Sequence, residues 1–377
     1  MTLPPVLFVI IQSGALANGG ISSISQIIAR LEKHRPIILT DKETGQVGEW
    51  RRSGIEVHVL PQAATSGLAR NPLRAARSYW RYARAIAHLV RASGAKVIHA
   101  NDPGAMQLSI FPAKLTGAKV AFNIRDTIDP GRRPPRARYR ALFAAADHVF
   151  YLTQDMADRW AKIAANAKSA FSVTYSVVDP DIFPASTSYA GHEPPIVLLS
   201  GLISTKKGQL EFLREVSPVL AAHGISTWIA GDFDPSRNAY MARCAEAAAP
   251  LGEMAQFLGY RSDIPQLMAR SAVVAIPSRY EGLVRAMIEA MSCQRPIVSF
   301  DVCSASEILG DRSGGAGTVV MHGDYPAMAE AILRYCRDPG LAAAAGQKGR
   351  STAGKLFEPG AVVSRYEDVY RVLGSGA

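Results

Sequence analysis

Short apolar runs rich in β-branched residues alternate with amphipathic stretches along the first half of the chain. Segments such as 21–32, 78–92 and 156–165 have helical periodicity. Strands that alternate with helices predict parallel sheets covered on both faces. The predicted strands lie at 6–11, 36–40, 57–60, 97–100, 120–124 and 148–152.

The same pattern restarts after a linker at 179–195 that is rich in Pro, Gly and Ser. With a length of 377 residues, the restart predicts two Rossmann-like doubly wound domains, 1–185 and 186–359, that face each other across a ligand-binding cleft. A last helix within 360–377 is expected to pack back on the first domain. The second set of predicted strands lies at 196–200, 227–230, 255–258, 273–276, 296–299 and 318–320.

The stretch RYEGLVRAMIEAM, from Arg279 to Met291, combines a buried pattern with two acids. From Leu283 onward it predicts a helix that is apolar nearly all round, and such a helix is normally buried. Glu289 nevertheless lies within this helix, and Glu281 precedes it. Because glutamate is rarely buried without a partner, both carboxylates are expected to have specific partners.

The composition indicates a globular protein whose basic charge lies in one half. The chain is 48% hydrophobic and 20% charged, with a net charge of +10. Residues 1–187 hold 24 Lys and Arg against 13 Asp and Glu, whereas the remainder holds 18 against 19. The N-terminal half is therefore expected to meet an anionic partner: a membrane surface, a phosphorylated substrate or nucleic acid.

Neither the start of the chain nor its cysteines indicate export. The apolar run at 6–11 has no basic region before it and is too short for a signal-peptide core or a membrane span. The four cysteines are spaced for neither a zinc site nor a redox pair. We expect reduced thiols in a cytoplasmic protein.

Motifs of the second half resemble those of the retaining glycosyltransferases of family 4, which have the GT-B fold. Glu281 and Glu289 are separated by seven residues, as in the E-x7-E motif of that family. The run AQFLGYRSDIPQLMARSAVVAIPSRYEG and the stretch PIVLLSGLISTKKGQLEFL also match, and Lys207 falls at the family's phosphate-binding lysine. The resemblance covers 196–309 well and the first half more loosely. It implies transfer of a sugar from a nucleotide-diphosphate sugar to a hydroxyl of a glycan or lipid-linked acceptor, in the synthesis of bacterial lipopolysaccharide, capsule or exopolysaccharide.

A nucleotide sugar presents ribose hydroxyls, a diphosphate and a hexose, and the motif offers a group for each. Glu289 is expected to hold the ribose and Glu281 the hexose, because carboxylates accept charge-assisted hydrogen bonds from vicinal hydroxyls. The start of the helix would offer N–H groups to the diphosphate, and a glycine allows close backbone approach. The expected donor-binding residues are Gly201, Lys206, Lys207, Gly282, Leu283, Val284 and Glu289.

The acceptor is assigned to the first half. Gly19 and Gly20 match a Gly-rich loop that approaches the diphosphate and acceptor, and the alternative is a tight turn that opens a helix. Arg125 and Asp126 stand where many relatives have a His-Asp pair that touches the donor sugar; an arginine does not shuttle protons and would clamp a phosphate or acidic sugar instead. His99, at the end of a strand, is a further candidate, with a structural role as the alternative. The residues expected to be catalytic are Glu281, Lys207, Arg125 and Asp126.

Several positions depart from the family pattern, and three of them bear on catalysis. Leu202 stands where the family has an arginine, Cys303 where it often has a glycine, and Arg125 where many relatives have a histidine. These departures motivate an alternative: a catalytically weakened nucleotide-sugar-binding or scaffold protein of the same fold. A GT-B epimerase is disfavoured, because its acid and base residues are not apparent.

A basic helix is predicted within 69–93, with Tyr79, Trp80 and Tyr82 interleaved among its arginines. Spacings of three and four place the arginines on one helical face, which suits an anionic membrane interface. We therefore expect a peripheral enzyme at the inner membrane face; the alternatives are a solvated basic face or a nucleic-acid binder, and the donor motifs disfavour the latter. The arginines are Arg70, Arg74, Arg77, Arg81 and Arg84, and a second cluster comprises Arg132, Arg133, Arg136, Arg138 and Arg140.

No metal site is evident in the sequence. The resemblance implies metal-independent transfer without a bound cofactor, with a UDP- or GDP-linked sugar as co-substrate. Asp179 and Asp181 spell D-x-D, a metal-binding motif of another glycosyltransferase fold, but they lie in the predicted linker.

Overall fold

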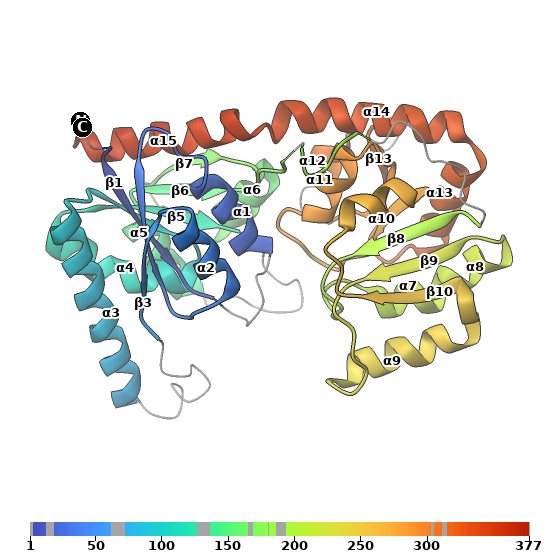
Figure 1. The fold of residues 1–377 in the computed structure, drawn as a ribbon, viewed down its shortest axis with the longest axis horizontal. Helices are drawn as coiled ribbons and strands as arrows, with labels where there is room; N and C mark the ends of the chain where they lie inside the picture. The colour runs from blue at the N-terminus through green and yellow to red at the C-terminus, as the bar shows by residue number, and fades with distance from the viewer. Residues whose placement is uncertain are drawn as a thin grey trace. The chain divides into compact units, whose positions relative to one another are not determined.

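The computed structural model divides the chain into two compact α/β units (Figure 1). The first, unit 1, comprises Met1–Thr127, Gly131–Val177 and Pro359–Ala377. The second, unit 2, comprises Ile128–Pro130 and Val178–Glu358. The structure describes residues 3–12, 19–61, 72–125, 127, 136–164, 169–179, 181–185, 194–302, 305–310 and 315–376.

Unit 1 is built on a parallel sheet of seven strands in the order β3-β2-β1-β4-β5-β6-β7. The chain winds outward from β1 in one direction, returns to the middle and winds outward in the other, which is the doubly wound arrangement. Its strands are β1 (Pro5–Ile10), β2 (Arg35–Thr40), β3 (Glu56–Val59), β4 (Val97–Ala100), β5 (Lys119–Ile124), β6 (His148–Tyr151) and β7 (Ala170–Val173). Its helices are α1 (Gly19–Ile28), α2 (Gly45–Arg52), α3 (Pro72–Ser93), α4 (Pro103–Thr116), α5 (Arg136–Ala145), α6 (Gln154–Ala164) and α15 (Pro359–Ser375).

One hydrophobic core of unit 1 joins the first strand to the last helix. Phe8 and Ile10 of β1 pack in one buried cluster with Val362, Tyr366 and Tyr370 of α15. Burial of several such side chains stabilises the fold by about 1.5–3 kcal/mol each. Helix α15 is therefore a structural part of unit 1, although more than 180 residues separate it in sequence from the rest of that unit.

Unit 2 repeats the doubly wound plan with six parallel strands in the order β10-β9-β8-β11-β12-β13. Its strands are β8 (Ile196–Ser200), β9 (Ser226–Ala230), β10 (Ala255–Gly259), β11 (Val273–Ile276), β12 (Ile297–Phe300) and β13 (Gly317–Val320). Its helices are α7 (Gln209–Glu215), α8 (Ser217–Ala222), α9 (Ala239–Ala248), the 3-10 helix η2 (Ala249–Met254), α10 (Ile264–Arg270), α11 (Arg285–Ser292), α12 (Ala305–Leu309), α13 (Tyr325–Arg337) and α14 (Pro339–Leu356).

The structure confirms the predicted class of parallel α/β sheets, and every predicted strand agrees to within one residue at each end. The pattern missed β7, an edge strand whose side chains are exposed or half-buried. Helix α1 ends at Ile28, before the predicted end at residue 32. There the backbone N–H groups of Glu32 and Lys33 donate to the Glu367 carboxylate on α15, at 2.9 and 2.5 Å, and so leave the helix.

The boundary between the two units also differs from the sequence prediction. The units meet at residues 177 and 178, not at 185 and 186. Val177 belongs to the core of unit 1, whereas the carbonyl of Phe183 accepts a hydrogen bond from Arg350 of α14, in unit 2. Within the described part of the chain, no helix combines the length and the apolar character that crossing a membrane requires.

Candidate active site

The motif residues of unit 2 lie in two loops at the carboxyl edge of its sheet. One loop follows β8 and runs from Gly201 to Gly208, and the other follows β11 and contains Glu281. Because β8 and β11 are neighbours in the sheet, their carboxyl ends lie side by side. The backbone N–H of Arg279 donates to the carbonyl of Lys206 at 2.8 Å and ties the two loops together.

Glycines allow these loops to approach each other closely. Gly208 has a φ of +74°, and a Cβ on it would lie 2.1 Å from the carbonyl oxygen of Pro277 in the other loop. Gly201 has a φ of +142°, and its own carbonyl oxygen would be 2.1 Å from a Cβ on Gly231. A side chain at Gly208 would therefore push the two loops apart, and one at Gly231, directly after β9, would displace the start of the first loop.

The first loop also has an internal brace that sequence reasoning missed. The buried side chain of Gln209 donates to the carbonyl of Leu202 at 3.0 Å and accepts from the backbone N–H of Ser204 at 3.3 Å. Gln209 directly follows the lysine-glycine pair, so its place in the motif was the available signal.

Glu281 pairs with both lysines of the motif. The ammonium of Lys207 lies 2.6 Å from one carboxylate oxygen, and that of Lys206 lies 3.4 Å from the other. The Glu281 side chain is only 7% exposed, whereas the lysines are about one quarter exposed. Lys206 also lies over the ring of Tyr280, 5.2 Å from its centroid. Two ammonium groups on one carboxylate leave this cluster with a net positive charge.

Glu289 has a different partner. Its carboxylate accepts from two nitrogens of the Arg285 guanidinium, at 3.1 and 3.0 Å, one helical turn before it. Each motif carboxylate is therefore paired with a basic side chain. The predicted contacts of Glu281 with a hexose and of Glu289 with a ribose stay predictions.

The helix that carries Glu289 begins two residues later than predicted. Val284 is its N-cap, with extended backbone angles and no side-chain cap, and the helix proper starts at Arg285. Gly282, Leu283 and Val284 are buried in the loop before it. No side chain caps this helix, and the backbone N–H of Met287 donates to the carbonyl of Val284. The start of a helix carries the positive end of its dipole, which suits an anion.

The predicted residues of unit 1 are only partly placed. Gly19 and Gly20 are the first two residues of α1, and Arg125 directly follows β5. Asp126 lies outside the described residues, as do Arg70, Cys303, Arg132 and Arg133, and so does the side chain of Arg74.

His99 lies in the core of unit 1. Its ring is completely buried, and its Nδ1 lies 2.9 Å from the Tyr370 hydroxyl. The rings of Phe8 and Phe150 lie 5.0 and 5.9 Å from it. Burial, together with the charge of Arg125, lowers the pKa of His99 to about 3. His99 therefore links β4 to α15 as a neutral core residue, which matches the structural alternative, and its predicted contact with a ligand stays a prediction.

Other potentially reactive groups lie in unreactive surroundings. Cys244, Cys293 and Cys336 are free thiols, and burial raises the pKa of each to about 11. In the D-x-D stretch, the N–H of Asp181 donates to the carboxylate of Asp179 in a tight turn. Nowhere in the described ranges do three His, Cys, Asp or Glu side chains gather in a way that suits a metal ion.

Two family models match the chain, one in each unit. The model "Glycosyl transferase 4-like domain" matches residues 19–168, and "Glycosyl transferases group 1" matches residues 193–338. The chain belongs to glycosyltransferase family 4. Both loops of the candidate site, with Lys207, Glu281 and Glu289, lie inside the second matched segment.

Curated relatives are similar over part of their length. The α-D-kanosaminyltransferase of Streptomyces kanamyceticus is 30% identical over 190 residues, which are 49% of this chain and 48% of that protein. A lipopolysaccharide core biosynthesis mannosyltransferase of Rhizobium meliloti is 30% identical over 129 residues, 33% of this chain and 37% of that protein. The chain thus spans less than half of the length of these relatives.

Solved structures share the whole fold. The structure of Anabaena HepE in complex with UDP and glucose matches with a TM-score of 0.78 and 18% identity, over 97% of this chain and 98% of that one. At this identity the similarity shows the fold, which is GT-B. It agrees with the two doubly wound sheets described above.

Proposed function

We propose that the protein transfers a sugar, with retention of configuration, from a UDP- or GDP-sugar to a hydroxyl of a glycan or lipid-linked acceptor. The observation that carries this proposal is the cluster of Lys206, Lys207 and Glu281, at the carboxyl edge of the second sheet. In doubly wound sheets this edge is where nucleotides bind. The similarity to a lipopolysaccharide core biosynthesis mannosyltransferase supports a role in surface-polysaccharide synthesis.

The charges of the cluster suit a sugar diphosphate. The Lys207 ammonium would bind the diphosphate and stabilise the negative charge that develops on it as the sugar leaves. Glu281 would then exchange an ammonium partner for hydroxyl donors of the hexose, which keeps its desolvated carboxylate satisfied. The uncapped first turn of α11 would supply further N–H groups to the diphosphate.

Retention follows if the acceptor attacks from the face that the diphosphate leaves. The bond from the anomeric carbon to the acceptor oxygen forms as the bond to the phosphate oxygen breaks. The acceptor proton passes to the departing phosphate oxygen, so no strong base on the protein is needed. An arginine at position 125 is compatible with this step, since Arg125 would act through its charge alone.

We also propose that the reaction takes place in the cytoplasm, at an anionic inner-membrane surface, and needs no metal ion. The exposed arginines Arg77, Arg81 and Arg84 of α3 support the membrane site. The lysine pair supports metal independence, because it supplies the positive charge that Mg²⁺ supplies elsewhere. Transfer that continues in excess EDTA is the expected result, and loss of transfer that Mg²⁺ restores would contradict it.

The Glu281→Gln substitution tests the proposed site. We expect release of UDP or GDP in the presence of membrane-lipid acceptors to fall roughly 10- to 100-fold, the loss of about 1.5–3 kcal/mol from one charge-assisted contact. Thermal stabilisation by the free nucleotide should persist, because Lys207 keeps its charge. Unchanged release, or no stabilisation of the wild-type protein by UDP, GDP or ADP or by their sugars, would refute the proposal.

A binding protein without turnover is the second candidate. Leu202, which is 64% exposed, takes the place of a family arginine in the first loop. If this departure abolishes catalysis, nucleotide will stabilise the wild-type protein while no acceptor supports its release. Glu281→Gln would then change neither measurement.

A further inference from the structure

We propose that α3 and α4 together form a membrane-inserting surface, in which exposed apolar side chains enter an anionic bilayer between arginines that bind the headgroups. We call the exposed face of Leu73, Trp80, Phe111 and Leu115, with Arg77 and Arg84, the α3–α4 surface. The inference rests on the proposed function only in giving a reason for membrane contact, namely a lipid-linked acceptor. All residues of the α3–α4 surface belong to unit 1.

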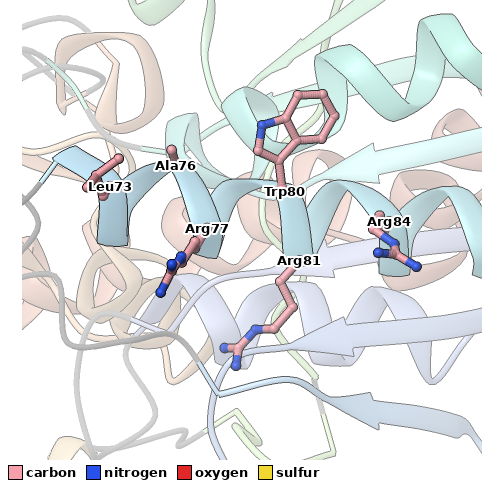
Figure 2. Close-up of a pocket in the computed structure, with 6 residues that line it drawn as sticks. All are labelled: Leu73, Ala76, Arg77, Trp80, Arg81 and Arg84. Carbon is pink, nitrogen blue, oxygen red and sulfur yellow. The ribbon is translucent and has the colours of Figure 1, made fainter.

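The exposed face of α3 mixes apolar and basic side chains. Leu73, Arg77, Trp80 and Arg84 recur at spacings of three and four, so they form one stripe along the helix. Leu73 is 74% and Trp80 51% exposed. Tyr82 and Ile86, on the opposite face, are completely buried. Figure 2 shows this stripe along α3, with Trp80 extending from one side and Arg77 and Arg81 from the other.

Helix α4 extends the apolar part of this surface. The two helices pack against each other, and the Trp80 and Phe111 rings meet edge to face with centroids 5.0 Å apart. Phe111 is 39% exposed, and Leu115, one turn further on, is 54% exposed. Large apolar side chains that gather on an exposed face mark an interaction site.

The segment of the chain that carries this surface is strongly basic. Between residues 57 and 125 the sequence has ten Lys and Arg and a single acid, Asp102. That acid does not neutralise the surface, because its carboxylate accepts from the backbone N–H groups of Gly104 and Ala105 and caps α4. A helix with arginines beside exposed Trp and Leu is typical of elements that lie in a membrane interface.

Other occupants fit this combination less well. In a two-fold dimer the same patch faces itself, so Arg77 and Arg84 would be brought towards their own copies. Nucleic acid would use the arginines but leave Leu73 and Leu115 against a hydrated phosphate backbone. An anionic bilayer meets both kinds of side chain, since headgroups pair with the arginines and the acyl region takes up the apolar groups.

Sedimentation with phospholipid vesicles tests the contribution of charge. The full chain is expected to bind phosphatidylglycerol-containing vesicles and to bind pure phosphatidylcholine vesicles weakly or not at all. Arg77→Gln with Arg84→Gln should weaken binding roughly 30-fold, about fivefold for each arginine. Arg81 is left unchanged, because it donates to the carbonyl of Pro61. The matched control, Arg334→Gln with Arg337→Gln, removes two exposed arginines from α13 of unit 2 and should leave binding unchanged.

Tryptophan fluorescence tests insertion separately from charge. Of the four tryptophans, Trp80 is the one expected to enter the bilayer, since Trp50 and Trp160 are buried and Trp228 packs under Arg270. Vesicles with brominated acyl chains should quench part of the wild-type emission and none in Trp80→Phe. Leu115→Gln should weaken vesicle binding about fivefold while nucleotide stabilisation is unchanged.

Three results would overturn the inference. They are equal binding to neutral and anionic vesicles, unchanged binding by Arg77→Gln with Arg84→Gln, and Trp80 emission that brominated lipid leaves unquenched. A dimer that these substitutions dissociate, without quenching, would assign the surface to a second copy of the chain. If UDP or GDP still stabilises the protein in any of these cases, the surface assignment and the proposed membrane location fail while the proposed sugar transfer stands. If the protein binds anionic vesicles as expected but no nucleotide stabilises it, the proposed function fails while the surface assignment stands.

Discussion

At the scale of single residues, the candidate site combines one carboxylate with two ammonium groups. Glu281 pairs with both Lys206 and Lys207, and a neighbouring position that is basic in the family is Leu202 here. Lys206 lies within 3.4 Å of the same carboxylate as Lys207. We therefore expect Lys206 to supply the second positive charge that residue 202 does not.

Lys206→Ala should weaken UDP or GDP binding roughly tenfold, which is the loss of one charge-assisted contact of about 1.5 kcal/mol. Adding Leu202→Arg to this variant should recover most of the affinity, because it returns a cation to the same loop. Isothermal titration calorimetry measures both effects. Lys355→Ala, an exposed lysine of the same unit, is the control. Full affinity in Lys206→Ala would show that Lys206 has no such role.

At the scale of elements, close contact between two loops brings the charged groups together. The loop after β8 and the loop after β11 touch at Gly208 and Pro277, where a Cβ would overlap a carbonyl oxygen. Gly208 is also the N-cap of α7, with left-handed backbone angles. The geometry of the lysine pair therefore depends on a backbone contact that involves no functional group.

Comparing Gly208→Ala with Gly224→Ala separates the effect of a left-handed backbone conformation from the effect of steric overlap with Pro277. Both glycines have a φ of about +70°, at +74° and +70°, but nothing lies within 4 Å of a Cβ on Gly224. The left-handed conformation should lower the free energy of unfolding by about 1 kcal/mol in either variant. The steric overlap at Gly208 should lower the free energy of unfolding by a further amount on the order of 2 kcal/mol. It should also abolish stabilisation by nucleotide. Denaturant unfolding measures the difference, and equal effects would contradict the contact.

At the scale of the whole molecule, the two units should respond differently to acid. Burial lowers the pKa of three histidines of unit 1: His34, His99, to about 3, and His148, to about 4. A histidine whose pKa is lowered on folding takes up a proton more readily in the unfolded chain.

Unit 1 should therefore lose stability as the pH falls below about 6.5, whereas unit 2 should change less. For His99 alone the free energy of unfolding should fall by up to about 1.4 kcal/mol per pH unit between 6.5 and its folded pKa of about 3. The raised pKa of Asp102 acts in the opposite direction, at the lower pH where an aspartate titrates. Hydrogen exchange at pH 7 and pH 5, corrected for intrinsic rates, should show protection lost first in β4 and β5. Equal loss in β8 and β11 would contradict this prediction.

The sequence by itself determined the strands, the repeated α/β plan and the type of chemistry. Strand positions were predictable because buried parallel strands are short, continuous apolar runs, and that local property needs no knowledge of neighbours. Lys207 and Glu281 were predictable as candidate site residues because a familiar motif surrounds each, but their ion pair was not predicted. Strand β7 and the end of α1 were not, since the first has no apolar run and the second depends on Glu367, more than 330 residues away.

Only the tertiary structure decided what each polar residue contacts. His99 stands at the end of a strand, as a ligand-binding residue often does, but α15 returns to cover it with Tyr370. Phe111 and Leu115 look like ordinary core residues in the sequence, and the packing of α4 beside α3 leaves them exposed next to Trp80. Both outcomes have one physical reason. Burial is set by which distant segments fold onto a residue, and local periodicity does not contain that information.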